Sequence, residues 1–260
     1  MRKALLAIVV ASVAACSLAT SLDGYSGGEA PRDGAAPDAL VDAASSDGGA
    51  LVDASWCAVN APDATLCVDF EANGIDLFTQ QQTIRGTVSV EPGDASSPPN
   101  AMLAVATPSA TVYSAVGGAY GDLSTATGAR LAFDFRLEDS PAGNGIGVGM
   151  LTIGEWSIQI NTNQTTVTLS EYDSSSGVYR EPYVSPAIDL TRWTHVDVDV
   201  TLGPTPQVTF DIGANRVVTD TQIKPPGATG NFTARVGVPY AREGFGPARV
   251  RVDNVVYVRH

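Results

Sequence analysis

A short run sets the pattern of this chain: Leu131-Ala132-Phe133-Asp134-Phe135-Arg136-Leu137. Large apolar side chains stand at every second position, with small or charged side chains between them. A period of two is that of a β-strand with one face buried and the other in solvent, and it does not suit a helix. The run therefore predicts a strand that is half buried.

The same period recurs beyond Trp56, between turns rich in Gly, Pro, Asn and Asp. The apolar positions of these runs are Trp156, Ile158, Ile160; Val196, Val198, Val200, Leu202; Val208, Phe210, Ile212; Val236, Val238, Tyr240; and Val250, Val252, Val256, Val258. The turn residues at 161–164 predict a hairpin between 156–160 and 165–172. Ten or so short strands, without a helical stripe or an internal repeat, predict an all-β fold of two antiparallel sheets packed as a sandwich, with a barrel as the alternative.

The amino terminus has the three regions of an export signal. A basic start is followed by an apolar run from Ala4 to Ala11, and small residues precede Cys16. The apolar run is too short to span a bilayer as a helix. Val13-Ala14-Ala15-Cys16 resembles the lipobox of bacterial lipoproteins, so residues 1–15 are expected to be a signal peptide and Cys16 the site of lipidation. An ordinary signal cleaved after Ala15 is the alternative.

Residues 16–55 are expected to be a flexible acidic tether, since Ala, Asp, Gly, Ser and Pro dominate and little apolar surface is available for burial. Residues 56–260 are then expected to form the folded domain. Ser17, rather than Asp, follows the cysteine, and by resemblance to the usual sorting rule this implies the outer membrane, at its periplasmic face or at the cell surface.

Two cysteines remain once Cys16 carries a lipid. In an exported chain, Cys57 and Cys67 are most simply a disulfide that closes a short loop. A zinc site is the weaker alternative, because His195 and His260 are far away in sequence.

The formal net charge is -13, from 28 acidic and 15 basic residues. Such a surface repels phosphate backbones, which excludes nucleic acid as a partner. Lys3 and Lys224 are the only lysines. Membrane contact is therefore expected only through the lipid anchor.

Four segments resemble the concanavalin A-like lectin and glucanase superfamily, which includes laminin G-like domains. Residues 66–71 resemble its first strand in exported bacterial members, and residues 96–103 resemble a serine-proline turn before an early strand. Residues 193–198 are similar to a laminin G-like strand, and residues 252–257 to the closing strand. The resemblance implies a two-sheet jelly roll. The layout of a lipoprotein, tether and domain resembles that of lipoproteins of myxobacterial type.

The resemblance also implies candidate sites. Laminarinase-type hydrolases of this superfamily carry Glu-x-Asp-x-Glu on one strand, whereas this chain has only Glu171-Tyr172-Asp173. Members often hold a structural calcium, and Glu71 and Asp253 resemble its ligand positions. No organic cofactor is expected, because nucleophile elbows and phosphate or dinucleotide loops are missing from the sequence.

Three ionisable residues are expected to lie on the same face of one strand. These are His195, Asp197 and Asp199, which alternate with the apolar residues of their run. If that face lines a groove, the imidazole and the two carboxylates can act as acid and base. An ordinary solvated sheet face is the alternative.

Sugar binding needs aromatic faces in a groove, because the CH groups of a sugar ring stack on them. The candidates are Tyr113, Tyr120, Tyr172, Tyr179 and Tyr183. The sequence favours a non-catalytic, lectin-like domain that binds a glycan or an envelope protein. The alternatives are a divergent polysaccharide hydrolase or lyase, and a structural or adhesive envelope protein.

Overall fold

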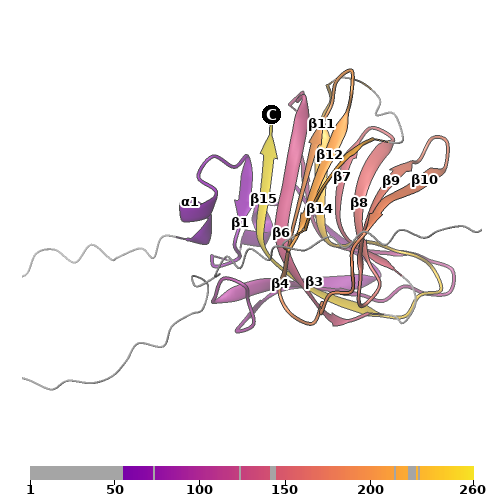
Figure 1. Cartoon of the computed structure of the whole chain (residues 1–260). Coiled ribbons are helices and arrows are strands. Elements are labelled where there is room, and N and C mark those ends of the chain that lie inside the picture. The colour runs from indigo at the N-terminus through magenta and orange to yellow at the C-terminus, as the bar shows by residue number, and fades with distance from the viewer. Residues whose placement is uncertain are drawn as a thin grey trace, which may run out of the picture. The chain divides into compact units, whose positions relative to one another are not determined.

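The computed structural model describes residues 55–72, 74–122, 124–140, 145–213, 215–221, 227 and 229–260. Cys16 and the expected signal peptide and tether up to residue 54 lie outside the described residues. The described chain folds into two antiparallel sheets packed face to face, as a jelly-roll sandwich (Figure 1). The fold class expected from the sequence is thereby confirmed. Among the described residues, no helix combines the length and apolar character needed to cross a membrane.

Sheet A has the order β13-β12-β11-β6-β15-β4-β3, and β1 pairs with β15. Its strands are β1 (Leu66–Val68), β3 (Gly86–Pro92), β4 (Asn100–Ala106), β6 (Gly128–Asp139), β11 (Thr194–Thr201), β12 (Gln207–Ile212), β13 (Asn215–Asp220) and β15 (Ala248–Arg259).

Sheet B has the order β10-β9-β8-β7-β14-β5-β2. Its strands are β2 (Gln80–Ile84), β5 (Ser114–Gly121), β7 (Ile146–Ile153), β8 (Trp156–Thr162), β9 (Val167–Asp173), β10 (Val178–Val184) and β14 (Phe232–Ala241). A short helix, α1 (Trp56–Asn60), precedes β1, and a single 3-10 turn, η1 (Gly74–Leu77), precedes β2.

The alternating residues predicted from the sequence fill the core between the sheets. The apolar side chains of the run at 131–137, of β8, of β11 and of β12 are buried. The predicted hairpin is β8 paired with β9. Burial of side chains of this size stabilises the fold by about 1.5–3 kcal/mol for each fully buried one.

Two predicted runs change face partway, because a β-bulge adds one residue to a strand and reverses the parity that follows. In β14 the register shifts between Val238 and Ala241, and Tyr240 is exposed rather than buried. In β15 the register shifts between Asp253 and Val256, so that Val255 enters the core instead. The expectation that Tyr240 and Val258 belong to the core was therefore wrong, and Val256 is buried but lies outside the core cluster, whereas the strands themselves are present.

The chain before β1 is joined to the sandwich by the predicted disulfide, Cys57 to Cys67. The backbone N–H of Cys57 also donates to the Asp69 carboxylate at 3.1 Å. Together these contacts hold α1 next to β1.

Candidate functional site

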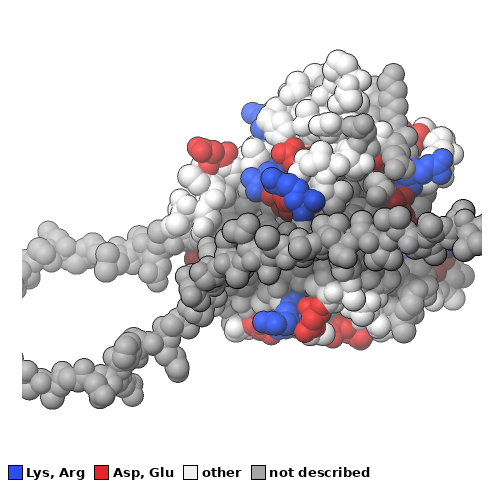
Figure 2. All heavy atoms as spheres, viewed as in Figure 1, with Lys and Arg blue, Asp and Glu red and all other residues white. Residues whose placement is uncertain are grey.

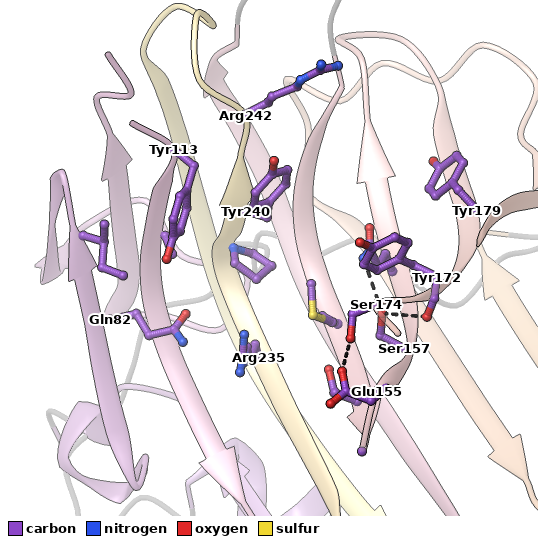
Figure 3. A pocket seen from close by; sticks show the side chains of 17 residues that line it. Gln82, Tyr113, Glu155, Ser157, Tyr172, Ser174, Tyr179, Arg235, Tyr240 and Arg242 are labelled. Carbon is purple, nitrogen blue, oxygen red and sulfur yellow. Dashed lines mark hydrogen bonds between the residues drawn. The ribbon is translucent and has the colours of Figure 1, made fainter. Parts of the chain in front are cut away.

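A groove with a volume of about 670 Å³ lies on the outer face of sheet B (Figure 3). Its lining comes from all seven strands of this sheet and from the turns that join them. The polar and aromatic lining residues are Gln82, Tyr113, Thr152, Glu155, Ser157, Gln159, Tyr172, Ser174, Tyr179, Arg235, Tyr240 and Arg242. The size and the mixture of rings with polar groups are typical of a ligand site.

The floor of the groove is formed by rows of residues that pair between neighbouring strands of sheet B. In one row Arg235 pairs with Met150, Met150 with Gln159, and Gln159 with Ser170. Because neighbouring strands lie about 4.8 Å apart, the backbones at Arg235 and Gln159 are about 10 Å apart across the floor. A guanidinium and an amide therefore face the same space from two strands.

Arg235 is the basic residue at the centre of the groove. No carboxylate of the described residues forms an ion pair with it, and its Nε is buried without a hydrogen-bond partner. The Oγ1 of Thr152, which also lines the groove, is buried without a partner. A buried donor without a partner costs about 1–3 kcal/mol, and a bound acceptor removes that cost. The floor is thus suited to an anionic, oxygen-rich ligand.

Tyrosine rings form the walls. Tyr113 and Tyr240 face each other with centroids 5.8 Å apart, and both are more than two-fifths exposed. Tyr172 and Tyr179 pair across β9 and β10. The Tyr179 hydroxyl donates to Glu181 at 2.9 Å and lies 2.8 Å from the Ser170 hydroxyl.

Two of these phenols titrate above their ordinary range. Partial burial raises the pKa of Tyr179, and the Glu181 charge raises it further. Partial burial likewise raises the pKa of Tyr240, with Glu243 adding to it. Both side chains are therefore neutral hydrogen-bond donors at neutral pH.

Three of the five tyrosines proposed from the sequence line the groove, namely Tyr113, Tyr172 and Tyr179. The other two pack against the core. Tyr120 contacts Tyr257 with centroids 5.4 Å apart, and Tyr183 contacts Phe210 at 5.9 Å.

Sequence reasoning missed Arg235, Tyr240 and Arg242. Arg235 carried a signal, because it stands between Ala234 and Val236 and a charged residue in an alternating strand points outward. For Tyr240 the sequence pattern was misleading, because Tyr240 stands at the same alternate position as the buried valines Val236 and Val238. The bulge in β14 turns it outward.

His195, Asp197 and Asp199 do share one strand face, but it is the outer face of sheet A, away from the groove. His195 lies 2.7 Å from Asp134, Asp197 binds Arg130 at 2.6 Å, and Asp199 lies 3.3 Å from His260. Figure 2 shows acidic and basic side chains close together on the face in view. A catalytic role for these three residues stays a prediction, and it does not involve the groove.

The proposed calcium ligands are not gathered into a cage. Asp253 is fully buried, and its oxygens accept hydrogen bonds from the Ser97 N–H and hydroxyl and from the Asn254 N–H. Burial raises the pKa of Asp253 to about 7. Among the described residues no group of three or more His, Cys, Asp or Glu side chains is placed to hold a metal. Calcium binding through Glu71 and Asp253 stays a prediction.

Comparison with protein-family models gives no match, and comparison with curated proteins gives none either. Solved structures do resemble the fold. The endo-β-1,4-glucuronan lyase of the fungus Trichoderma reesei superposes with a TM-score of 0.56 at 14% identity, over 76% of this chain and 96% of that chain. The cellulose-induced protein Cip1 gives 0.56 at 13%, over 74% and 96%.

A third similar structure is the alginate lyase vAL-1 of a Chlorella virus, with a TM-score of 0.53 at 11% identity, over 76% of this chain and 100% of that chain. At such identities the likeness concerns the fold alone. The chain therefore has the jelly-roll sandwich fold of these polysaccharide lyases, a fold related to that of the concanavalin A-like proteins.

Proposed function

We propose that the domain binds an acidic polysaccharide in the sheet B groove and cleaves it by β-elimination. The observation that carries the proposal is Arg235, a cation with a buried, unpartnered Nε on the floor of a groove walled by tyrosines. This cation suits an acidic polymer, and the fold likeness to structures named as polysaccharide lyases supports cleavage over the non-catalytic binding that the sequence alone favoured.

β-Elimination requires a positive charge near the uronate carboxylate, and the groove contains one. A proton leaves the carbon next to the uronate carboxylate, the carbon–oxygen bond to the next sugar breaks, and a double bond forms between the two carbons. Negative charge builds up on the carboxylate side, where a fixed guanidinium stabilises it. Arg235 is assigned this task, with the Gln159 amide on the same row as a second donor.

Two tyrosines are placed to move protons. The hydroxyls of Tyr172 and Tyr240 have no hydrogen-bond partner in the described structure. Tyr240 is held neutral by its raised pKa, so it is suited to protonate the departing sugar oxygen. Tyr172, on the other side of the groove floor, is assigned the abstraction of the proton as its phenolate, after its own proton has been lost to solvent.

The fold comparison supports the proposal, because two of the similar structures bear the names glucuronan lyase and alginate lyase. Both names refer to enzymes acting on polymers of uronic acids.

The test is the release of unsaturated uronate from glucuronan and from alginate by the domain of residues 56–260, followed by ultraviolet absorbance. Arg235→Gln is expected to lower kcat/KM by about 100-fold or more, the size found when a charge-stabilising donor is lost. Arg216→Gln is the matched control, since Arg216 is exposed on sheet A and pairs with Asp211, away from the groove. If Arg235→Gln cleaves as fast as the unaltered domain, the proposed site is incorrect.

Binding without cleavage is the second candidate. Among the described residues that line the groove there is no histidine, the commonest proton-transfer residue. In that case Arg235→Gln weakens affinity for the polymer, and neither protein releases unsaturated product.

We also propose that the chain is exported and anchored through Cys16. Labelled fatty acid is expected to be incorporated into the full chain expressed in a Gram-negative host, and Cys16→Ser is expected to abolish the label. A label that persists in Cys16→Ser contradicts the anchor.

A further inference from the structure

The groove does not end at its central floor. A second hollow of about 350 Å³ adjoins it and shares Gln159, Tyr179, Tyr240 and Arg242 with it. The lining of this extension includes Asn161, Asn163 and Thr168, all of them neutral hydrogen-bonding side chains. The sheet therefore offers one extended binding surface with distinct parts.

Two carboxylates belong to this surface. Glu155, at the β7–β8 turn, accepts a hydrogen bond from the Ser174 hydroxyl. Glu181, on β10, accepts one from the Tyr179 hydroxyl at 2.9 Å and lines the extension. Within the described part of the chain, neither forms an ion pair with an arginine or a histidine. Their negative charges therefore act on a ligand in the groove.

Two cations balance them. Arg235 lies on β14 at the centre, and Arg242 lies just beyond the end of the same strand. Among the described residues that line the combined surface, positive and negative side chains are thus equal in number. A polymer with a carboxylate on every sugar places like charges next to Glu155 and Glu181, and its charges are not matched overall.

The strand order gives the distance between the positive and negative side chains across the sheet. Four strand steps separate β14 from β10. At about 4.8 Å per step this is about 19 Å, or about four sugars of about 5 Å each. A chain lying across the strands therefore meets Arg235 and Glu181 within one bound oligosaccharide.

We propose that the groove selects a polysaccharide in which uronates are interspersed with uncharged sugars, with a uronate on Arg235 and uncharged sugars beside Glu155 and Glu181. This inference rests on the proposed function, and it narrows the substrate class. Uncharged sugars donate hydroxyl hydrogen bonds to the two carboxylates and accept them from the neighbouring amides. Repulsion by the carboxylates disfavours a polymer with a charge on every sugar.

The experiment compares polymers that share one backbone and differ only in charge. Glucuronan and alginate are each used intact, with about half of the carboxylates chemically reduced to hydroxymethyl groups, and with nearly all reduced. Affinity for the full chain is measured by isothermal titration at fixed ionic strength, because exposed charges are screened by salt. The half-reduced polymer of at least one backbone is expected to bind most tightly, by about three-fold or more over the intact one.

The variants Glu155→Gln and Glu181→Gln keep a hydrogen-bond acceptor and remove the charge. Each is expected to strengthen binding of the intact polymer by about three- to ten-fold and to weaken binding of the half-reduced one by about two-fold or more, because its hydroxyls lose a charged acceptor. Asp76→Asn is the control, because Asp76 is exposed on η1 and does not line the groove. This variant has the same change in net charge and is expected to leave both affinities unchanged.

The outcomes separate this inference from the proposed function. If the intact polymers bind at least as tightly as the half-reduced ones and the glutamine variants change nothing, while Arg235→Gln still abolishes binding, the charge pattern is refuted and the site stands. If no polymer binds at any degree of reduction, both are refuted. If Asp76→Asn has the effect of Glu181→Gln, net charge rather than the groove is responsible.

Discussion

His195 has an acidic partner that the sequence could not reveal. Its Nδ1 lies 2.7 Å from Asp134, which comes from a different strand 61 residues away. The hydrogen bond to Asp134 raises the pKa of His195 above its ordinary value of 6.5, although burial opposes the shift. For Asp134 burial raises the pKa, but the hydrogen bonds from His195, Ser96 and Asn254 outweigh it and lower the value.

This pair predicts a pH-dependent contribution to stability. A raised histidine pKa stabilises the folded state fully below about pH 6.5, and the gain is lost as the pH rises through the folded-state pKa. His195→Gln is therefore expected to lower the free energy of unfolding by about 1 kcal/mol near pH 5.5, since the imidazole is half exposed. Near pH 9 the loss is expected to be smaller.

Urea denaturation at the two pH values measures the difference. Arg216→Gln serves as the control, because an arginine stays charged throughout this range. A cost of His195→Gln that is the same at both pH values contradicts the ion pair.

At the scale of the strand, a bulge in β14 turns Tyr240 toward the groove, and a pair of glycines lets β5 and β14 approach closely. Gly117 of β5 pairs with Gly237 of β14, and both have positive φ, of 139° and 111°. A Cβ on Gly117 would lie 3.1 Å from the Gly237 Cα and closer still to the Val236 carbonyl oxygen. The two strands approach here in a way that only glycine allows.

A matched pair of substitutions isolates the crowding from the backbone strain. Gly203 has the same φ of 139° as Gly117, but a Cβ there meets nothing within 4 Å. Gly203→Ala is expected to cost about 1–2 kcal/mol of unfolding free energy from the dihedral alone. Gly117→Ala is expected to cost about 3 kcal/mol or more, because crowding is added. Equal losses in thermal or urea denaturation would show that the close approach is unimportant.

At the scale of the whole molecule, the disulfide and the groove are on separate parts of the sandwich. The ring closed by Cys57 and Cys67 spans a sequence separation of 10. Constraint of the unfolded chain by a ring of this size stabilises the fold by about 2–3 kcal/mol. Replacing both cysteines with serine is expected to lower the unfolding free energy by that amount.

The same double variant is expected to leave polysaccharide affinity unchanged, because no residue of α1 or β1 lines the groove. Denaturation and titration calorimetry on one preparation test both parts. A loss of affinity in protein that is still folded would connect the amino-terminal segment to the site.

The sequence by itself determined the class of fold, the strands with buried faces and the disulfide. These follow from local rules. The period of two identifies the strands, and two cysteines that remain in an exported chain are expected to form a disulfide with each other. The tyrosines of the groove were only partly identified, since composition names aromatic residues without saying which of them are exposed.

Only the tertiary structure decided which sheet carries the groove, that Arg235 lies at its centre, and that His195, Asp197 and Asp199 lie on the opposite sheet. Outward-facing residues of both sheets have the same alternating signature, so the period cannot distinguish one outer face from the other. The bulge that exposes Tyr240 depends on how β14 pairs with β5, a strand more than a hundred residues away in sequence. Pairing between distant strands is a property of the assembled sheets, and the local pattern does not encode it.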